Sequence, residues 1–296
     1  MKIRDSTADR TFYLLNYAVL IVFVILVLYP LVYVLSASFS SASAIANNEV
    51  RLLPIGFNTQ AYATILESPR LLVGFGNSVL YTVGGALIGT ILTVLAGYAA
   101  SRRELPFRRV ILFFFVIPTL VSAGIVPTYI VVQQLGLLDT RWAILLPGAM
   151  SVFNVIITRT FYEMTVPQEL LEAGQVDGAS DFRFFLQVAL PLSKPIIAVN
   201  LLFYGLAQWN GWFSAFLYTS DPSLAPLQLV LRELLSESAV NPAMIGGGNL
   251  AEILARRELF DKLKYAMIVV AMIPPLIAYP FVQKHFVKGA LIGSIK

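Results

Sequence analysis

Long apolar stretches without a charged residue alternate with short polar segments along this chain. A helix that crosses a bilayer needs about 20 mostly apolar residues, and each charge-free stretch can hold one. The pattern predicts an all-α integral membrane protein with six transmembrane helices, at about 12–39, 72–101, 110–135, 142–162, 192–218 and 266–285. The charge-free windows cover residues 11–48, 71–101, 110–138, 142–158, 195–220 and 265–283.

Composition supports a membrane location. Of 296 residues, 57% are hydrophobic and 13% are charged, whereas a soluble domain carries about 25% charged residues. Ser41–Ala44 resembles a signal-peptide cleavage site, but the first charge-free window is far longer than a signal h-region of about 7–15 residues. The chain has no Cys and one His, which argues against disulfides, thiol chemistry and a catalytic metal site.

Lys and Arg residues indicate the orientation. An even number of spans places both termini on one side, and that side carries 13 of the 21 Lys and Arg residues. Five of the other eight lie in one long loop, where charge has little influence on orientation. We therefore expect both termini and the polar segment 165–191 to be cytoplasmic. This topology accounts for the net charge of +4 without a nucleic-acid partner.

The polar segment 165–191 has the pattern of a short helix, a tight turn and a second helix. Thr165, with Pro167 and Gln168 after it, resembles a helix start, and the helix should run to about Val176. Gly178 permits a tight turn, and Ser180 can cap a second helix. The apolar side chains expected to anchor this element to the bundle are Phe182, Phe184, Phe185 and Leu186. On physical grounds alone, the segment could equally be a well-capped loop that has no partner.

The spacing within this segment is similar to the EAA loop of ABC importer permeases. That loop reads E-A-A, three residues, G, nine residues, I-x-L-P; here Gly174 replaces the second Ala and Val188 replaces Ile. Gly174 should loosen the helix by about 1 kcal/mol relative to Ala. In the family this loop is a coupling helix that docks on an ATPase subunit. The resemblance assigns docking to Glu172, Ala173, Gly174, Asp177, Gly178 and Ala179.

The resemblance extends over nearly the whole chain. Residues 208–212, 226–231 and 280–296 resemble the polysaccharide and oligosaccharide branch of the maltose-importer class. This implies a type I ABC importer transmembrane domain at 71–285, which includes the coupling loop 165–191 and an external loop 219–264. Residues 1–70 would form a cytoplasmic N-terminus, the first span and an external segment, and residues 286–296 a cytoplasmic tail.

Polar and aromatic residues on the fifth predicted span suit the passage of a sugar, which needs groups for its hydroxyls and flat faces for its rings. Tyr204, Gln208 and Trp212 recur at i, i+4 and i+8 and should share one helix face. Alternatively, Trp209 and Trp212 form an aromatic belt at the outer interface. The residues expected along the substrate path are Tyr204, Gln208, Trp209, Asn210, Trp212 and Asn154.

The external loop 219–264 is too long for a simple turn, and it contains the run Gly246-Gly247-Gly248-Asn249. In the family, such loops receive an extracytoplasmic solute-binding protein, and we expect that role here. A folded cap without a binding role is the alternative.

The sequence as a whole predicts a permease subunit of an ABC importer for oligosaccharides in a bacterial inner membrane. No G-x-x-x-x-G-K-[ST] loop occurs, so no cofactor is expected in this chain, and ATP and Mg should bind to two partner ATPase subunits. A second, different permease subunit completes the expected assembly. The alternatives are a permease for amino acids or peptides, an ion-coupled carrier and a membrane enzyme. No span has the ionisable residues that carriers usually place at mid-membrane.

Overall fold

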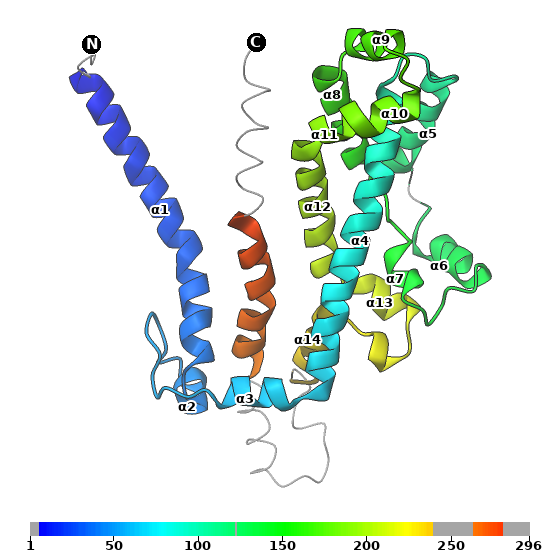
Figure 1. The fold of residues 1–296 in the computed structure, drawn as a ribbon. Helices are drawn as coiled ribbons and strands as arrows, with labels where there is room; N and C mark the ends of the chain where they lie inside the picture. Colours follow the sequence, from blue (N-terminus) through cyan, green and yellow to red (C-terminus); the bar gives the residue numbers. More distant parts are fainter. Residues whose placement is uncertain (1–5, 122, 239–262, 281–296) are drawn as a thin grey trace. The chain divides into compact units, whose positions relative to one another are not determined.

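The computed structural model describes residues 6–121, 123–238 and 263–280, and within these ranges it contains helices and no strand (Figure 1). The chain divides into two compact units. The first comprises Met1–Ser68 and Leu231–Ile273, and the second comprises Pro69–Val230 and Pro274–Lys296.

The first unit contains α1 (Thr7–Ser38), α2 (Ala42–Ala46) and α3 (Gln60–Glu67). A capping box between Ser6 and Asp9 starts α1. Its apolar side chains remain exposed over most of its length, as expected of a helix that faces lipid. The C-terminal end of α1 is buried, and the Tyr62 hydroxyl of α3 donates to Ser38 Oγ at 2.7 Å. The first predicted span is therefore confirmed as a helix.

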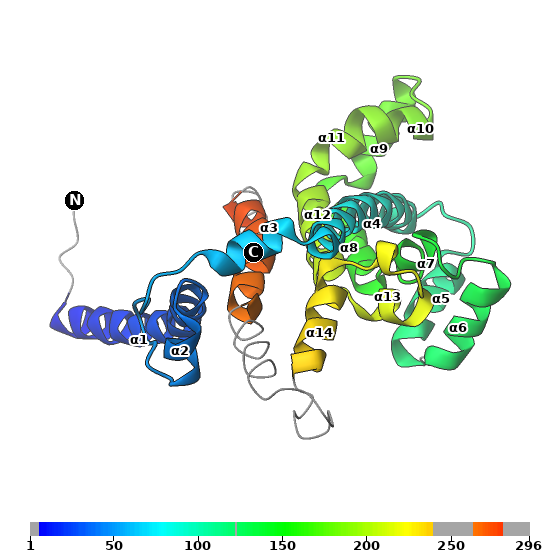
Figure 2. The same ribbon diagram turned by 90° about the horizontal axis from the view of Figure 1, so that it is seen from below.

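The second unit is built around α4 (Pro69–Ser101), which packs against α8 (Val152–Thr165) and α12 (Lys194–Trp209) (Figures 1 and 2). The Gly-rich face of α4 allows this close approach. An added Cβ at Gly85 would lie 2.6 Å from Gln208 Cγ, one at Gly89 2.8 Å from the Tyr204 ring, and one at Gly97 2.7 Å from Thr158 Cγ2. These glycines thus serve packing within the chain, as small residues do at helix contacts in lipid.

Shorter helices lie between and after these three along the chain. They are α5 (Arg108–Leu120), α6 (Ile125–Gln134), α7 (Trp142–Leu145), α9 (Gln168–Val176), α10 (Asp181–Phe184), the π-helix η1 (Phe185–Ala189), α11 (Leu190–Leu192), α13 (Phe213–Tyr218), the 3-10 helix η2 (Pro222–Leu224) and α14 (Leu227–Ser238).

Among the described residues, three helices are long and apolar enough to cross a membrane: Thr7–Ser38, Pro69–Ser101 and Leu263–Pro280. Up to five spans result if two bent pairs are each counted as one. These pairs are α5 with α6, and Asp181–Leu192 with Lys194–Trp209, the latter bent by 76°. The predicted bounds of the first and second spans, and of the sixth as far as residue 280, therefore agree with single helices, whereas the helices predicted at 110–135, 142–162 and 192–218 are each interrupted.

The predicted helix at 142–162 is interrupted between α7 and α8. Pro147 lacks an N–H, and Gly148 has φ of +75°, so the segment forms a turn. The chain re-enters a helix at Ser151, whose N–H donates to the Tyr204 hydroxyl at 2.8 Å. Because this turn contains no charged residue, it does not interrupt the charge-free window, and the pattern predicted one continuous helix.

The other two predicted helices are interrupted for similar reasons. The predicted helix at 110–135 is broken at Gly124, which has φ of +83°. Pro127 then lies in the first turn of α6, where its missing N–H costs little. The predicted helix at 192–218 is broken at Asn210–Trp212, between α12 and α13.

At one end of α4, three side chains hold the segment that follows α13. Asn77 Nδ2 donates to the carbonyls of Ser223 (2.7 Å) and Ala225 (3.1 Å). The Tyr81 hydroxyl donates to the Leu224 carbonyl at 2.9 Å, and Ser78 Oγ accepts from the N–H of Leu227 at 2.8 Å. Polar side chains on α4 thereby satisfy the backbone of an irregular segment.

We expect Asn77→Ala to destabilise the protein by about 1–3 kcal/mol, because it removes the donor to two carbonyls, of which that of Ala225 is buried. The measurement is the thermal unfolding midpoint of the detergent-purified protein. Val79→Ala is the matched control, since Val79 lies on α4 and is exposed. Equal midpoints for the two variants would contradict the assignment.

Candidate functional site

The segment 165–191 forms a helical hairpin that follows α8. Helix α9 ends at Val176, as predicted, but it does not begin with a Thr165 cap. Thr165 is the last residue of α8, and Pro167 is the N-cap of α9, with no side-chain cap. A residue that is still helical cannot adopt the extended conformation of an N-cap, so the predicted capping box at Thr165 is wrong.

Gly178 ends α9 in a Schellman motif. It has φ of +78°, its N–H donates to the Gln175 carbonyl at 3.0 Å, and the N–H of Ala179 donates to the Gly174 carbonyl at 2.9 Å. This pair of bonds defines the motif. The predicted tight turn is confirmed, and it fixes the direction in which the chain leaves α9.

Helix α10 begins at the predicted cap, since Ser180 Oγ accepts from the N–H of Arg183. It continues into the π-helix η1 and α11. Phe184 and Phe185 are buried, but Phe182 is 70% exposed and Leu186 43% exposed. Of these four side chains, only those of Phe184 and Phe185 therefore pack into the core beside the hairpin. The expectation that Phe182 and Leu186 also do so is wrong.

The six residues assigned to docking divide between two faces of the hairpin. Gly174 and Ala179 are half-buried, and an added Cβ at Gly174 would lie 2.8 Å from Phe184 Cδ2. Gly174 thus makes room for Phe184 inside the hairpin. The exposed members are Glu172, Ala173, Asp177 and Gly178.

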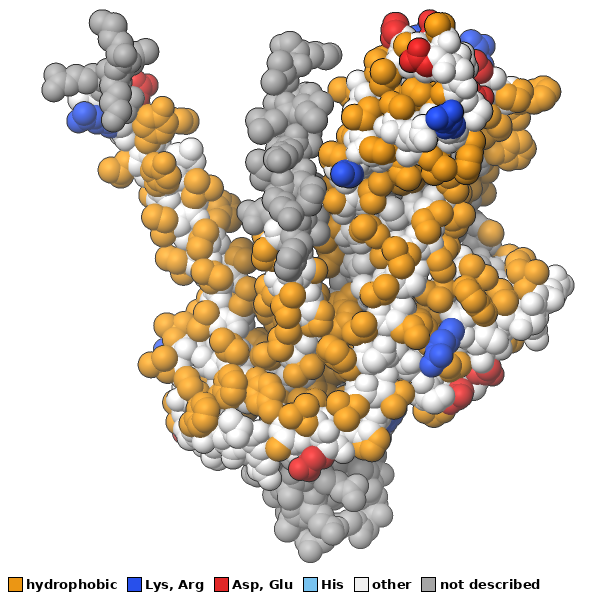
Figure 3. Space-filling view, viewed as in Figure 1, with side chains coloured by type: hydrophobic (Ala, Val, Ile, Leu, Met, Phe, Trp, Pro, Cys, Tyr) orange, Lys and Arg blue, Asp and Glu red, His pale blue; other side chains and the backbone are white. Residues whose placement is uncertain are grey.

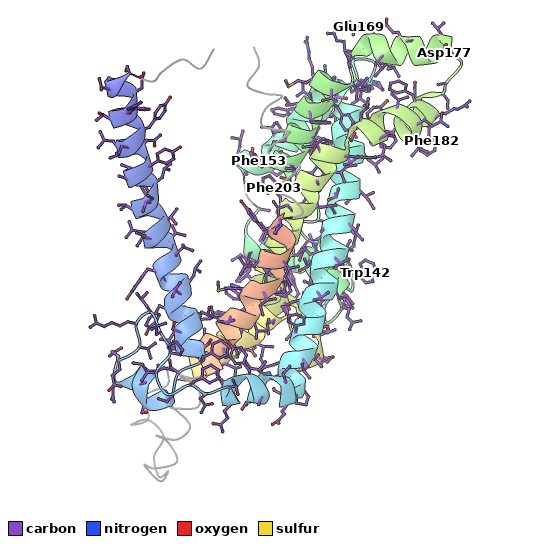
Figure 4. All side chains as sticks on the ribbon, turned by 60° about the vertical axis from the view of Figure 1, so that its left-hand side comes forward. Trp142, Phe153, Glu169, Asp177, Phe182 and Phe203 are labelled. Atoms are coloured by element: carbon purple, nitrogen blue, oxygen red, sulfur yellow. The ribbon has the colours of Figure 1, made fainter. Side chains whose placement is uncertain are left out.

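Helix α9 presents its exposed side chains at the end of the second unit. Figure 4 shows Glu169 and Asp177 at opposite ends of α9, and Phe182 on α10 beside it. On the face shown in Figure 3, charged side chains of this unit gather around α9 and α10, while apolar side chains cover α4 and α12. This distribution suits a segment that extends into water from an apolar helix bundle.

A polar pocket of about 650 Å³ lies beside the base of the hairpin. Arg108 and Arg159 both contact Glu163 Oε1 on its wall, and Gln168 is hydrogen-bonded to Glu104. Arg102 is buried, and its Nη2 donates to the Val166 carbonyl at 2.8 Å. No local sequence pattern predicts these contacts, although Arg102 and Arg103 lie in the connection between α4 and α5.

Tyr204, assigned to the substrate path, is buried within the packing of α4, α8 and α12. Its hydroxyl lies 2.6 Å from Thr93 Oγ1 and accepts the N–H of Ser151. These contacts give Tyr204 a role in holding the start of α8 against α4.

The other residues assigned to the path on helix α12 and beyond do not share one face. Gln208 is half-buried against Gly85, and Trp209 is buried with its ring 5.8 Å from that of Phe75. Asn210 is exposed, and its Nδ2 donates to the Leu206 carbonyl. Trp212 follows the end of α12, so the expected i, i+4, i+8 face with Tyr204 and Gln208 is wrong.

Asn154 on α8 is buried. One turn later on α8, Thr158 Oγ1 accepts from Asn200 Nδ2 at 2.8 Å. Thr158 of α8 thus meets Asn200 of α12, and such pairing satisfies polar groups inside an apolar helix bundle.

Of the loop 219–264, the structure describes residues 219–238 and 263–264. Asp221 begins η2 by accepting hydrogen bonds from the backbone N–H and the hydroxyl of Ser223, which hold the pKa of its carboxyl below the usual range. Gly246–Asn249, and with them the predicted contact with a binding protein, lie outside the described residues, as does the tail 286–296.

Relatives of this chain are transport permeases. The polygalacturonan/rhamnogalacturonan transport system permease protein YtcP of Bacillus subtilis (strain 168) is 37% identical over 289 residues, which cover 97% of this chain and 99% of that protein. Protein LplC of the same organism is 38% identical over 267 residues, which cover 90% of this chain and 88% of that protein.

A solved structure shares the fold. One chain of a bacterial ABC transporter involved in the import of the acidic polysaccharide alginate is 32% identical, with a TM-score of 0.85, and the match covers 96% of this chain and 100% of that one. A family model for the binding-protein-dependent transport system inner membrane component matches residues 85–291. The chain therefore belongs to this family, the membrane-spanning permease subunits of ABC importers.

Proposed function

We propose that the chain is the permease subunit of an ABC importer that carries oligosaccharides containing uronic acids across a bacterial inner membrane. The observation that carries the proposal is the hairpin 165–191, whose exposed face bears Glu172, Ala173 and Asp177. Two similar proteins support it. One is named for polygalacturonan/rhamnogalacturonan transport and the other is a transporter of alginate, and all of these polysaccharides contain uronic acids.

In this proposal the exposed face of α9 docks on an ATPase subunit. Glu172 and Asp177 offer carboxylates to a basic or amide-rich groove, and Ala173 and Gly178 allow close approach. ATP and Mg bind to the two ATPase subunits, and this chain hydrolyses nothing itself. Closure of the ATPases displaces α9 and thereby changes the packing of the spanning helices.

The rest of the assembly follows from the same proposal. A second, different permease subunit forms the other half of the pathway, and an extracytoplasmic binding protein delivers the saccharide to the loop 219–264. Both termini and the hairpin lie in the cytoplasm, which agrees with the excess of Lys and Arg on that side.

The substrate path in this proposal lies near the end of α12, where Gln208, Asn210 and Trp212 are not fully buried. Asn154 and Tyr204 are buried among the helices, and in this proposal they support the wall of the path. No Lys or Arg occurs between residues 195 and 220. The carboxylates of the substrate are therefore recognised by the binding protein or by the second permease.

Glu172→Lys should abolish ATP-dependent uptake by the reconstituted importer, because it reverses a charge at the docking face. Glu169→Lys is the matched control, since it makes the same charge change on α9 outside the EAA spacing. Unchanged uptake with Glu172→Lys would contradict the docking proposal. An equal loss with Glu169→Lys would assign the effect to the net charge of α9 rather than to Glu172.

Gly174→Ala should lower the stability of the hairpin, although Ala is the family residue, because its Cβ would overlap Phe184. Overpacking of this kind costs about 1–3 kcal/mol. The double variant Gly174→Ala, Phe184→Leu should recover much of the loss, since Leu vacates the ring position. The measurement is limited proteolysis of the hairpin in the purified importer, and equal rates for wild type and Gly174→Ala would show that Phe184 adjusts freely.

The substrate class is tested by ATPase stimulation. The purified importer with its binding protein should be stimulated by oligogalacturonides or alginate oligosaccharides, and not by neutral malto-oligosaccharides of equal length. Stimulation by the neutral series alone would overturn the uronate assignment and leave the ABC permease assignment intact.

A further inference from the structure

The last turn of α4 contacts both ends of the hairpin. Arg102 directly follows Ser101, the last residue of α4. Its side chain is only 9% exposed, although Arg is almost never fully buried without a partner. Its Nη2 donates to the Val166 carbonyl at 2.8 Å, and its Nε to Ser101 Oγ at 3.1 Å.

Val166 occupies the junction between α8 and α9. The carbonyls in the last turn of a helix have no intrahelical donor, and a cation there also interacts favourably with the helix dipole. Pro167 follows at once, and its fixed φ sets the start of α9. By holding the Val166 carbonyl, Arg102 fixes the point at which the hairpin leaves α8.

Tyr98, one turn earlier on α4, connects Arg102 to the other end of the hairpin. The Arg102 guanidinium lies 4.9 Å from the centroid of the Tyr98 ring. That ring lies 4.7 Å from the ring of Phe185 in η1 and 5.3 Å from the ring of Tyr162 in α8. The chain entering α9 and the chain leaving α10 therefore both meet the end of α4, through Arg102 and Tyr98.

Within the described part of the chain, no carboxylate forms an ion pair with Arg102, and its Nη1 has no hydrogen-bond partner. The neighbouring Glu163 is contacted by Arg108 and Arg159. A buried charge held mainly by one carbonyl is a costly way to stabilise a fold. The contact is better suited to fixing the position of the hairpin relative to the end of α4.

We infer that Arg102 is a positioning residue for energy coupling, which transmits displacement of α9 into α4. The inference rests on the proposed docking of α9 on an ATPase subunit. Because α4 packs along both α8 and α12, a shift at its end reaches the helices that form the pathway. Loss of the contact leaves docking and basal hydrolysis in place but interrupts transmission between the spanning helices and the ATPase subunit.

The test uses the complete importer in proteoliposomes, with the saccharide that stimulates wild type, and measures basal ATPase, stimulated ATPase and uptake. For Arg102→Gln we expect normal assembly and basal ATPase within twofold of wild type. Stimulation and uptake should each fall at least tenfold. Arg102→Lys should recover part of the loss, because an ammonium can still donate to the Val166 carbonyl. The control Arg103→Gln, at an exposed neighbour, should match wild type.

Normal coupling in Arg102→Gln would overturn the inference. So would a parallel loss of assembly in Arg102→Gln and Arg102→Lys, because that result would assign Arg102 to folding. Glu172→Lys, measured in the same experiment, separates the two proposals: if it leaves uptake unchanged, docking through Glu172 is wrong whatever Arg102 does.

Discussion

The close approach of α4 to α8 and α12 is the constraint on which the second unit depends. In lipid the hydrophobic effect does not drive helices together, so packing and a few interhelical hydrogen bonds must do so. Gly85, Gly89 and Gly97 let the neighbouring side chains reach the backbone of α4. Where the chain is irregular, as at Ser151 and at 220–227, polar side chains of α4 and α12 supply the missing backbone partners.

The same constraint extends to the hairpin. Tyr98 near the end of α4 and Arg102 just after it contact the two segments that join the hairpin to the bundle, at Phe185 and at Val166. Inside the hairpin, Gly174 receives Phe184, and the Schellman bonds of Gly178 and Ala179 close the turn. Of the six residues assigned to docking, Gly174 and Ala179 therefore pack inside the hairpin, and the four exposed ones remain available to a partner. This division explains why Gly at position 174 is compatible with the motif.

Local signals in the sequence predicted local structure well. The end of α9 at Gly178 and the Ser180 cap depend on residues within a few positions of each other, and both are confirmed. The charge-free windows located the apolar helices but missed turns such as Pro147–Gly148, because apolar turns carry no charge. The contact of Arg102 with Val166 joins residues 64 positions apart, and no local pattern reports such a pairing. Trp212 was misplaced because an i, i+8 pattern assumes that the helix continues through Gly211.

The most direct test of the account is a cross-link from the exposed face of α9. The chain has no cysteine, so a single introduced thiol reports one position. In the intact importer, Ala173→Cys should form a cross-link to the ATPase subunit with a short reagent that joins a thiol to a lysine amine, whereas the half-buried Ala179→Cys should not. A cross-link from Ala173→Cys only to the second permease, or equal cross-linking to the ATPase from both positions, would contradict the account.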